Sequence, residues 1–144
     1  MRVLLDTSII VEIDRHNEKV LNLLKKLAEK NVEVVISTVT ISEILTGSYF
    51  KKDFKKSVLE AKKILSQFLW FDLDGEMAEK TAQLLSYLIL EGKPVEYQDV
   101  VIAATFFISR SDYLLTLNKD HFKIFPDIKN KVFTPQEFDE KIKL

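Results

Sequence analysis

The segment RVLLDTS at residues 2–8 decides the fold. Its first four residues form a short apolar run rich in Val and Leu, which predicts a buried strand over residues 2–5. The run stops at Asp6, Thr7 and Ser8, and residues of these types favour the start of a helix. We therefore expect a strand that leads directly into a helix from Ser8 to about Arg15.

The rest of the chain repeats this alternation of strand and helix. Further strands are predicted at 33–36, 68–73, 113–115 and 132–133. Helices are predicted at 18–30, 38–50, 53–67, 75–90, 97–109 and 135–144. Strands that alternate with helices predict an α/β fold, with one parallel sheet between helices on both faces. In such a fold, ligands bind at the carboxyl ends of the strands.

Length and composition narrow the class of protein further. The chain has 144 residues, which fits a single domain over 1–144. It has no Cys, which excludes disulfides and thiolate chemistry, and its two His leave little for a histidine-based metal site. A net charge of −1 argues against a globally basic nucleic-acid binder. The longest apolar run, 100–108, is too short to cross a membrane, and we expect a cytoplasmic protein.

Acidic residues occur near the expected carboxyl ends of the strands. Asp6 follows the first strand, Glu43 lies in the helix after the second, and Asp99 begins the helix before the fourth. The loop after the fourth strand adds polar groups, namely Thr116, Asn118 and Asp120. Because parallel strands end at the same edge of a sheet, we expect all of these residues to face one cleft.

A cluster of acids in apolar surroundings needs raised pKa values or a bound cation to offset its repulsion. Carboxylate, carbonyl and water oxygens favour Mg²⁺ or Mn²⁺ over zinc or copper. Such clusters serve phosphoryl chemistry, because the cation activates water and neutralises the phosphate. The sequence therefore predicts metal-dependent hydrolysis of phosphodiester bonds.

Four motifs resemble a known family. LLDTSIIVE at 4–12, ISEILTG at 41–47, QDVVIAAT at 98–105 and LLTLNKDHF at 114–122 are similar to those of PIN-domain ribonucleases, specifically the VapC toxins of VapBC toxin-antitoxin pairs. The resemblance implies a PIN-like three-layer α/β/α fold with a five-stranded parallel sheet. It also implies an Mg²⁺ or Mn²⁺ cofactor, endonucleolytic cleavage of RNA, a homodimer, and an antitoxin that blocks the site.

The resemblance also assigns roles by position. Asp6, Glu43 and Asp99 match the acids that bind the metal and carry out catalysis. The polar supports of these acids match Thr7, Ser8, Thr116 and Asn118.

One position departs from the family pattern. Family members commonly carry an acid immediately before the Phe of the last motif, where this chain has His121. Asp120 or Glu96 is a candidate for the fourth acid, or Asn118 holds a water on the metal. For His121 itself we expect packing beside Phe122 and a hydrogen bond to a backbone group.

Simpler explanations exist for several of these residues. Asp6 and Asp99 are both suitable helix caps. The lysine-rich stretch 51–63 is a candidate footprint for RNA phosphates, but a solvated helix face explains it better. The aromatic residues near the third strand are expected in the core rather than as platforms for bases; they are Phe68, Trp70 and Phe71.

Other functions stay open at this point. A haloacid-dehalogenase phosphatase needs Asp-x-Asp after the first strand, and here the second acid is replaced by Ser8. A phosphoacceptor receiver would use Asp72, but it needs a pair of acids after the first strand. A catalytically weak PIN-fold module that binds RNA or protein, and an RNA-maturation nuclease, are further alternatives.

Overall fold

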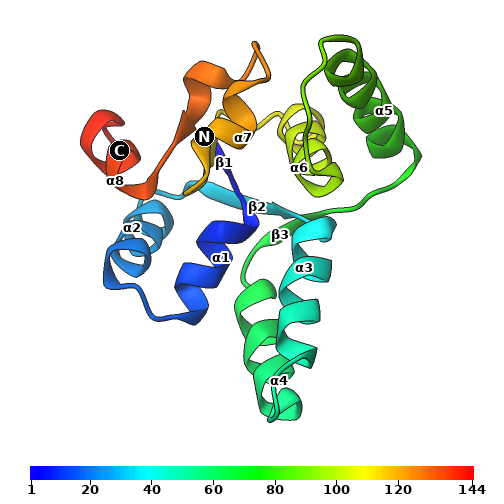
Figure 1. The fold of residues 1–144 in the computed structure, drawn as a ribbon. Coiled ribbons are helices and arrows are strands. Elements are labelled where there is room, and N and C mark those ends of the chain that lie inside the picture. Colours follow the sequence, from blue (N-terminus) through cyan, green and yellow to red (C-terminus); the bar gives the residue numbers. More distant parts are fainter.

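The computed structural model describes all residues 1–144, which form five strands, eight α-helices and one short 3₁₀-helix (Figure 1). The strands are β1 (Arg2–Leu5), β2 (Glu33–Ser37), β3 (Leu69–Phe71), β4 (Tyr113–Leu115) and β5 (Val132–Phe133). The helices are α1 (Thr7–Asp14), α2 (Glu18–Glu29), α3 (Thr38–Tyr49), α4 (Phe54–Leu65), α5 (Gly75–Leu90), α6 (Tyr97–Ile108), α7 (Lys119–Lys123) and α8 (Pro135–Lys141). None of the helices is long and apolar enough to cross a lipid bilayer.

The five strands form one sheet in the order β3-β2-β1-β4-β5, and every pair is parallel. Side chains alternate between the two faces of the central strand, because successive residues of a strand point in opposite directions. On β1, Val3 and Leu5 belong to one buried cluster, while Leu4 belongs to the other. The predicted five-stranded parallel sheet is confirmed.

Helices cover both faces of this sheet, which makes three layers. The cluster on one face includes residues of α1, α2, α8 and the end of α4, such as Ile10, Leu27 and Phe138. The cluster on the other face includes residues of α5, α6 and α7, such as Leu88 and Phe122. Figure 1 also shows α3 and α4 extending away from the sheet as an adjacent pair.

The strand order creates a crevice between β1 and β4. From β1 the chain moves outward through β2 to β3, and it then returns past β1 through α5 and α6 to reach β4. Ligands bind at such a switch in direction, outside the carboxyl ends of the two strands. The same order excludes the receiver alternative with Asp72, because receiver domains have the order 2-1-3-4-5.

Two predictions about local structure were wrong. Residues 119–123, part of the stretch predicted as a loop after the fourth strand, form helix α7; Lys129–Lys131, for which no element was predicted, form a 3₁₀-helix. Trp70 was expected in the core, yet it is 51% exposed. The physical reason is that β3 is an edge strand with only β2 beside it. The Trp70 indole Nε1 donates to the carbonyl of Leu65, which satisfies its one polar group.

Candidate active site at the ends of β1 and β4

Asp6 lies directly after β1 and is 4% exposed. Its Oδ2 accepts hydrogen bonds from Ser8 Oγ and from Thr116 Oγ1, both at 2.7 Å. Its side chain also caps α1 by accepting from the backbone of Ser8 at 3.4 Å. The capping explanation is therefore correct for Asp6, but the bond from Thr116 also fixes the carboxylate at the crevice between β1 and β4.

Glu43 lies on α3 and is half-buried. The Thr7 hydroxyl donates to Glu43 Oε1 at 2.7 Å, so the first residue of α1 orients this carboxylate. Thr7 Oγ1 lies 3.0 Å from the hydroxyl of Thr40, which is fully buried one turn before Glu43. Sequence reasoning missed Thr40. Its spacing of three residues from Glu43 on one helix was the signal that pointed to it.

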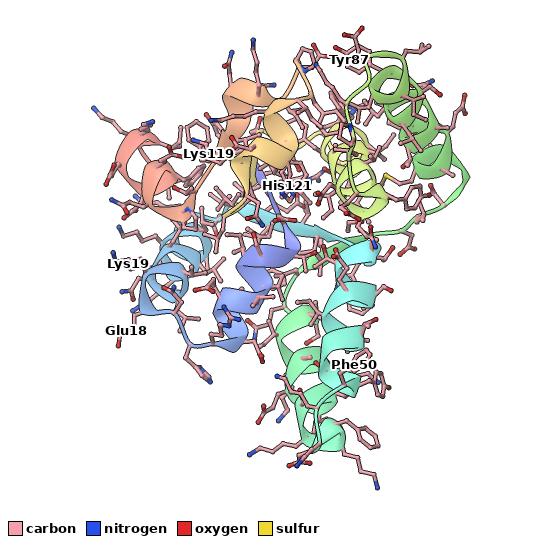
Figure 2. The ribbon with its side chains drawn as sticks, in the orientation of Figure 1. Glu18, Lys19, Phe50, Tyr87, Lys119 and His121 are labelled. Atoms are coloured by element: carbon pink, nitrogen blue, oxygen red, sulfur yellow. The ribbon has the colours of Figure 1, made fainter.

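Asp99 is the third residue of α6, and its side chain is 16% exposed. The helix cap is Glu96, and no side chain makes a capping bond there, so the capping explanation for Asp99 is wrong. Its Oδ2 lies 2.8 Å from Nδ1 of His121. His121, labelled in Figure 2, therefore contacts a carboxylate and not the expected backbone group, because it lies on helix α7, which packs against α6.

These side chains face one cavity of about 380 Å³. Only one of its ten lining residues is hydrophobic. The lining residues are Asp6, Thr7, Ser8, Val11, Glu43, Glu96, Gln98, Asp99, Asn118 and His121. The predicted residues Asp6, Glu43 and Asp99 are thus brought together, together with the expected supports Thr7, Ser8 and Asn118. Thr116 lies beneath them, fully buried, with its hydroxyl on Asp6.

The two candidates for a fourth acid differ in position. Glu96 lines the cavity that contains Asp6 and Glu43. Asp120 has a side chain that is 96% exposed, and it lines only the adjoining cavity, beside Asp99 and His121. The structure therefore favours Glu96 over Asp120 as an additional acid at this cavity.

The carboxylates that line the cavity repel one another. Burial raises the pKa of Glu43 above its usual value, and the nearby charges of Asp6 and Asp99 raise it further, against a lowering by the Thr7 hydrogen bond. Burial likewise raises the pKa of Asp99; His121 lowers it, whereas the charges of Asp6 and Glu96 raise it. A cation at the cavity would relieve this repulsion.

The donor set of the cavity suits a hard divalent cation. Asp6, Glu43 and Asp99 each use one carboxylate oxygen for hydrogen bonds, and none of the bonds within the protein involves the other oxygen, Oδ1, Oε2 or Oδ1 respectively. No three acidic or histidine side chains lie close enough together to enclose an ion unaided. Mg²⁺ normally keeps several waters and binds only one or two carboxylates, so oxygen donors of this kind fit it.

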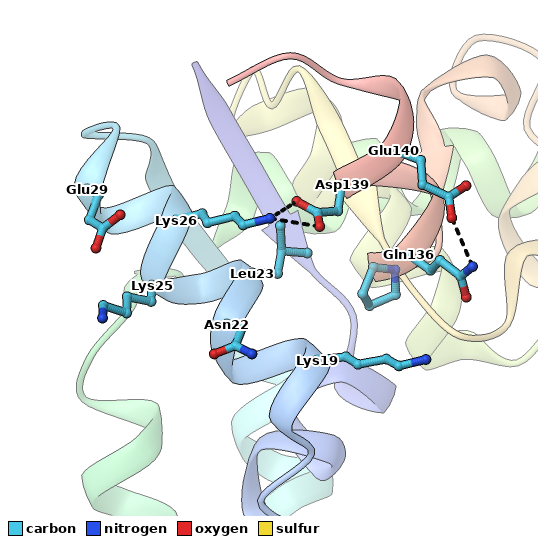
Figure 3. A pocket seen from close by; sticks show the side chains of 10 residues that line it. Lys19, Asn22, Leu23, Lys25, Lys26, Glu29, Gln136, Asp139 and Glu140 are labelled. Atoms are coloured by element: carbon cyan, nitrogen blue, oxygen red, sulfur yellow. Dashed lines mark hydrogen bonds and ion pairs between the residues drawn. The ribbon is translucent and has the colours of Figure 1, made fainter.

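A second cavity lies between α2 and α8, away from the four motifs (Figure 3). Its charged side chains have both signs, and Lys26 Nζ binds both carboxylate oxygens of Asp139 at 2.7 and 2.9 Å. These contacts attach α8 to α2. Because charges of both signs line this cavity, it has no cluster of like charges whose repulsion a bound ligand would offset. The acid cavity is therefore the candidate active site.

Comparisons with known proteins agree with this fold. The sequence model of the PIN domain matches residues 3–127, a span that includes Asp6, Glu43, Glu96 and Asp99. A comparison with curated protein sequences gives no match.

Solved structures with the same fold come from several bacteria. VapBC2 from Rickettsia felis, bound to a DNA fragment from its promoter, superposes with a TM-score of 0.82 at 24% identity, over 93% of this chain and 98% of the other. DNA-bound VapBC from Salmonella typhimurium gives 0.82 at 23% identity, over 94% and 98%. FitAcB from Neisseria gonorrhoeae gives 0.74 at 28% identity, over 93% and 98%.

Proposed function

Because the chain belongs to the PIN domain family, we propose that it is a metal-dependent endoribonuclease that hydrolyses phosphodiester bonds of RNA in the cytoplasm. One observation carries this proposal. Carboxylates from three separate elements, Asp6 after β1, Glu43 on α3 and Asp99 on α6, face one cavity at the switch point of a parallel sheet. We further propose that residues 1–144 form a single PIN domain.

In this proposal Asp6, Glu43 and Asp99 would hold Mg²⁺ or Mn²⁺ together with bound waters, through their oxygens that are free of internal hydrogen bonds. The bound cation would supply an activated water and neutralise the charge of the phosphate. The protein holds the carboxylates in place beforehand: Ser8 and Thr116 fix Asp6, and Thr7 fixes Glu43. Such support keeps ligands oriented and reduces the cost of reorganisation when the site is loaded.

The activity is tested with labelled single-stranded RNA in millimolar Mg²⁺ or Mn²⁺. Cleavage is expected for the wild-type protein and is expected to disappear with EDTA and in Asp6→Asn. Asp72→Asn is the matched control, because Asp72 is an exposed aspartate that does not line the cavity. Equal cleavage in EDTA, or full activity in Asp6→Asn, would contradict the metal-nuclease proposal. No cleavage under any of these conditions would leave a module that binds RNA or protein.

We also propose that the protein is the toxin of a toxin-antitoxin pair. Among the similar structures, VapBC2 from Rickettsia felis and VapBC from Salmonella typhimurium are bound to DNA, and VapBC-5 from Mycobacterium tuberculosis is a member of the VapBC family of toxin-antitoxin systems. In this chain, the partner is expected to place an Arg at Asp6 and Asp99, since a guanidinium pairs well with carboxylates. Co-expression with the neighbouring gene product should yield a complex without RNase activity. A complex that retains full activity would contradict inhibition at this site.

A homodimer is part of the proposal. Large apolar side chains are exposed at the end of α5, where Ile89 is 68% and Leu90 is 86% exposed. Burial of such residues is a common driving force for subunit association. Light scattering after gel filtration should give twice the monomer mass of 16.7 kDa. Monomers at all accessible concentrations would refute this part.

The RNA-maturation alternative uses the same chemistry at the same cavity. It differs from the toxin in its partner and its RNA, so the co-expression experiment separates them. An active nuclease that binds no neighbouring gene product would favour RNA maturation.

A further inference from the structure

We propose that the tip of the α3–α4 pair binds single-stranded RNA outside the acid cavity, with its aromatic rings stacked on bases and its lysines paired with phosphates. The tip is residues 49–56, YFKKDFKK, which end α3, form the turn and begin α4. This inference rests on the proposed nuclease function and adds a second contact between the protein and its RNA. The sequence alone favours a solvated helix face for these lysines, and the exposure of the aromatic residues among them changes that interpretation.

Three aromatic side chains are exposed at the tip. Phe50 is 87% exposed, Tyr49 57% and Phe54 41%. The rings of Tyr49 and Phe54 lie close together, with centroids 6.1 Å apart and planes inclined by 35°. Phe50, labelled in Figure 2, lies on the part of the pair that extends away from the sheet. Large apolar groups that gather in one exposed patch mark interaction sites, so these rings indicate a binding surface.

Four exposed lysines lie among these rings. They are Lys51, Lys52, Lys55 and Lys56. The tip has one acid, Asp53, so its net charge is +3 in a chain whose total is −1. Lys51 Nζ lies 3.6 Å from Asp14 Oδ2, and the other three lysines make no ion pair within the protein. Their ammonium groups are therefore available to phosphates, which supply much of the affinity in nucleic-acid binding.

The mixture of lysine and aromatic residues distinguishes a nucleic-acid surface from a protein interface. Protein interfaces are enriched in aromatic residues but depleted in Lys. Surfaces that bind single-stranded nucleic acid combine the two, because basic side chains follow the backbone while bases stack on aromatic rings. The tip has three aromatic residues and four lysines among its eight residues, which fits the second class.

The tip is continuous with the helices that form the acid cavity. Glu43 and Tyr49 are six residues apart on α3, so the tip begins about 9 Å from Glu43 along the helix axis. Helix α1 packs against both α3 and α4; it carries Val11 at the cavity and Asp14 beside Lys51 of the tip. At about 3.4 Å per stacked nucleotide, this span corresponds to roughly three nucleotides. One RNA strand can therefore occupy the cavity and extend to the tip.

The acid cavity does not attract an RNA backbone by its own charge. Four carboxylates line it, those of Asp6, Glu43, Glu96 and Asp99. The two lysines of α7, Lys119 and Lys123, are each paired with an acid of this chain. Binding energy from a remote part of a substrate can hold the reacting part in place. The tip supplies such a remote attraction for a strand whose scissile phosphate lies at the acids.

Stacking is tested by fluorescence anisotropy of a labelled single-stranded RNA in EDTA, where no cleavage is expected. Phe50→Ala and Phe50→Leu should both weaken binding by roughly 5- to 150-fold, the range for loss of one stacked base. Phe50→Trp should retain the wild-type affinity. Leu keeps an apolar side chain but has no aromatic face, so Phe50→Leu separates stacking from general apolar contact.

Tyr87→Leu is the matched control for the stacking test. Tyr87 is an exposed aromatic residue of α5, outside the tip, and Lys93 Nζ lies 5.9 Å from the centroid of its ring. It therefore offers the same pair of residue types at a different place on the surface. RNA affinity in Tyr87→Leu should equal that of the wild type.

The lysines are tested through the salt dependence of RNA affinity. Combining Lys55→Gln with Lys56→Gln should reduce the slope of log affinity against log salt by about 1.4, since each phosphate contact on a single strand contributes about 0.7. The matched control combines Lys19→Gln with Lys25→Gln, two exposed lysines of α2. Both double variants have the same net charge, so a change in the first alone reports the position of the lysines.

Cleavage gives a further readout. On RNA long enough to reach the tip, Phe50→Ala should raise KM and leave kcat unchanged, because the tip binds the ground state and the transition state equally. A fall in kcat with unchanged KM would contradict a role in binding.

Wild-type RNA affinity in Phe50→Leu, an unchanged salt slope in the Lys55 and Lys56 double variant, or no RNA binding by the wild type would overturn the inference. If these variants bind RNA normally but no longer form a complex with the neighbouring gene product, the tip is a protein interface and the inference is refuted.

Failure of this inference is distinguishable from failure of the proposed function. A wild type that binds RNA through the tip but cleaves none in Mn²⁺ would refute the nuclease and leave the tip as an RNA-binding surface. Mn²⁺-dependent cleavage with the same KM in the wild type and Phe50→Ala would refute the role of the tip and leave the nuclease.

Discussion

Thr116 donates a hydrogen bond of 2.7 Å from its Oγ1 to Oδ2 of Asp6, and this bond joins the residues that follow β4 and β1. Both side chains are almost completely buried. The bond therefore crosses the switch point of the sheet, where the chain after β1 continues toward β2 on one side and the chain after β4 continues toward β5 on the other. The orientation of the Asp6 carboxylate therefore depends on the register of β4 against β1.

Removing this bond should reduce metal affinity and cleavage rate more than it reduces the stability of the fold. Thr116→Val keeps the shape of the side chain but lacks the hydroxyl, and we expect metal affinity and cleavage rate to fall by about 10- to 100-fold, as for other groups that orient metal ligands. Thr116→Ser retains the hydroxyl and should stay close to wild type. Calorimetric titration with Mn²⁺ measures the affinity. Wild-type affinity in Thr116→Val would show that Asp6 needs no such support.

Divalent cations should stabilise the folded protein. An ion that binds the native cavity and not the unfolded chain raises the free energy of unfolding by about 2.7 kcal/mol at a hundredfold excess over Kd. Thermal melts with and without millimolar Mn²⁺ should therefore give a higher Tm for the wild type. The same shift in Asp6→Asn as in the wild type would place the stabilising ion elsewhere.

Two glycines should respond in opposite directions to the same substitution. Gly92 follows α5 with φ of 64°, a conformation that costs an L-residue about 1 kcal/mol, so Gly92→Ala should be destabilising by about that amount. Gly47 lies within α3 and has free space around it, so Gly47→Ala should be stabilising by about 0.5–1 kcal/mol. Urea unfolding measures both. Stability changes of the same sign in the two variants would contradict the backbone conformations described for Gly92 and Gly47.

Stability should depend on pH through Glu137. Hydrogen bonds from Lys119 Nζ and from the backbone of Thr134 lower the pKa of this carboxyl to about 2. Because its folded pKa lies below the unfolded value of 4.5, its contribution is present above pH 4.5 and is lost as the pH falls toward 2.

Glu137→Gln tests this dependence. Its free energy of unfolding should be lower than that of the wild type at pH 7, and the two curves should converge at acid pH. Lys119→Met removes the cationic partner of Glu137 and should weaken the same pH dependence. A gap between wild type and Glu137→Gln that is the same at pH 7 and pH 3 would contradict the assignment.

Local sequence patterns predicted most of the sheet. β1, β4 and β5 have the bounds expected from their apolar runs, and α5 begins and ends where expected. Helix α7 was missed because its five residues, KDHFK, carry no amphipathic repeat and only Phe122 is buried. Its helical form depends on packing against α6 and on the anchoring of Asn118, which are tertiary contacts.

The site was predictable to the extent that topology brings residues together. Asp6, Glu43 and Asp99 lie at positions that any parallel α/β sheet directs to one edge, and the structure places them around one cavity. The contact between His121 and Asp99 was not predictable, since it joins two helices 22 residues apart and depends on α7. The exposure of Trp70 was missed for a similar reason, because strand order alone determines that β3 lies at an edge.

We propose that the carboxylates of Asp6, Glu43 and Asp99 act as one metal-dependent unit. The most direct measurement is kcat/KM for Mn²⁺-dependent cleavage of single-stranded RNA by Asp6→Asn, Glu43→Gln, Asp99→Asn and their pairwise combinations. Each single substitution should abolish cleavage, and the pairs should lose little more, since residues that jointly hold one metal centre are not additive. Full activity in Asp99→Asn, or losses that multiply across the pairs, would contradict a single shared site.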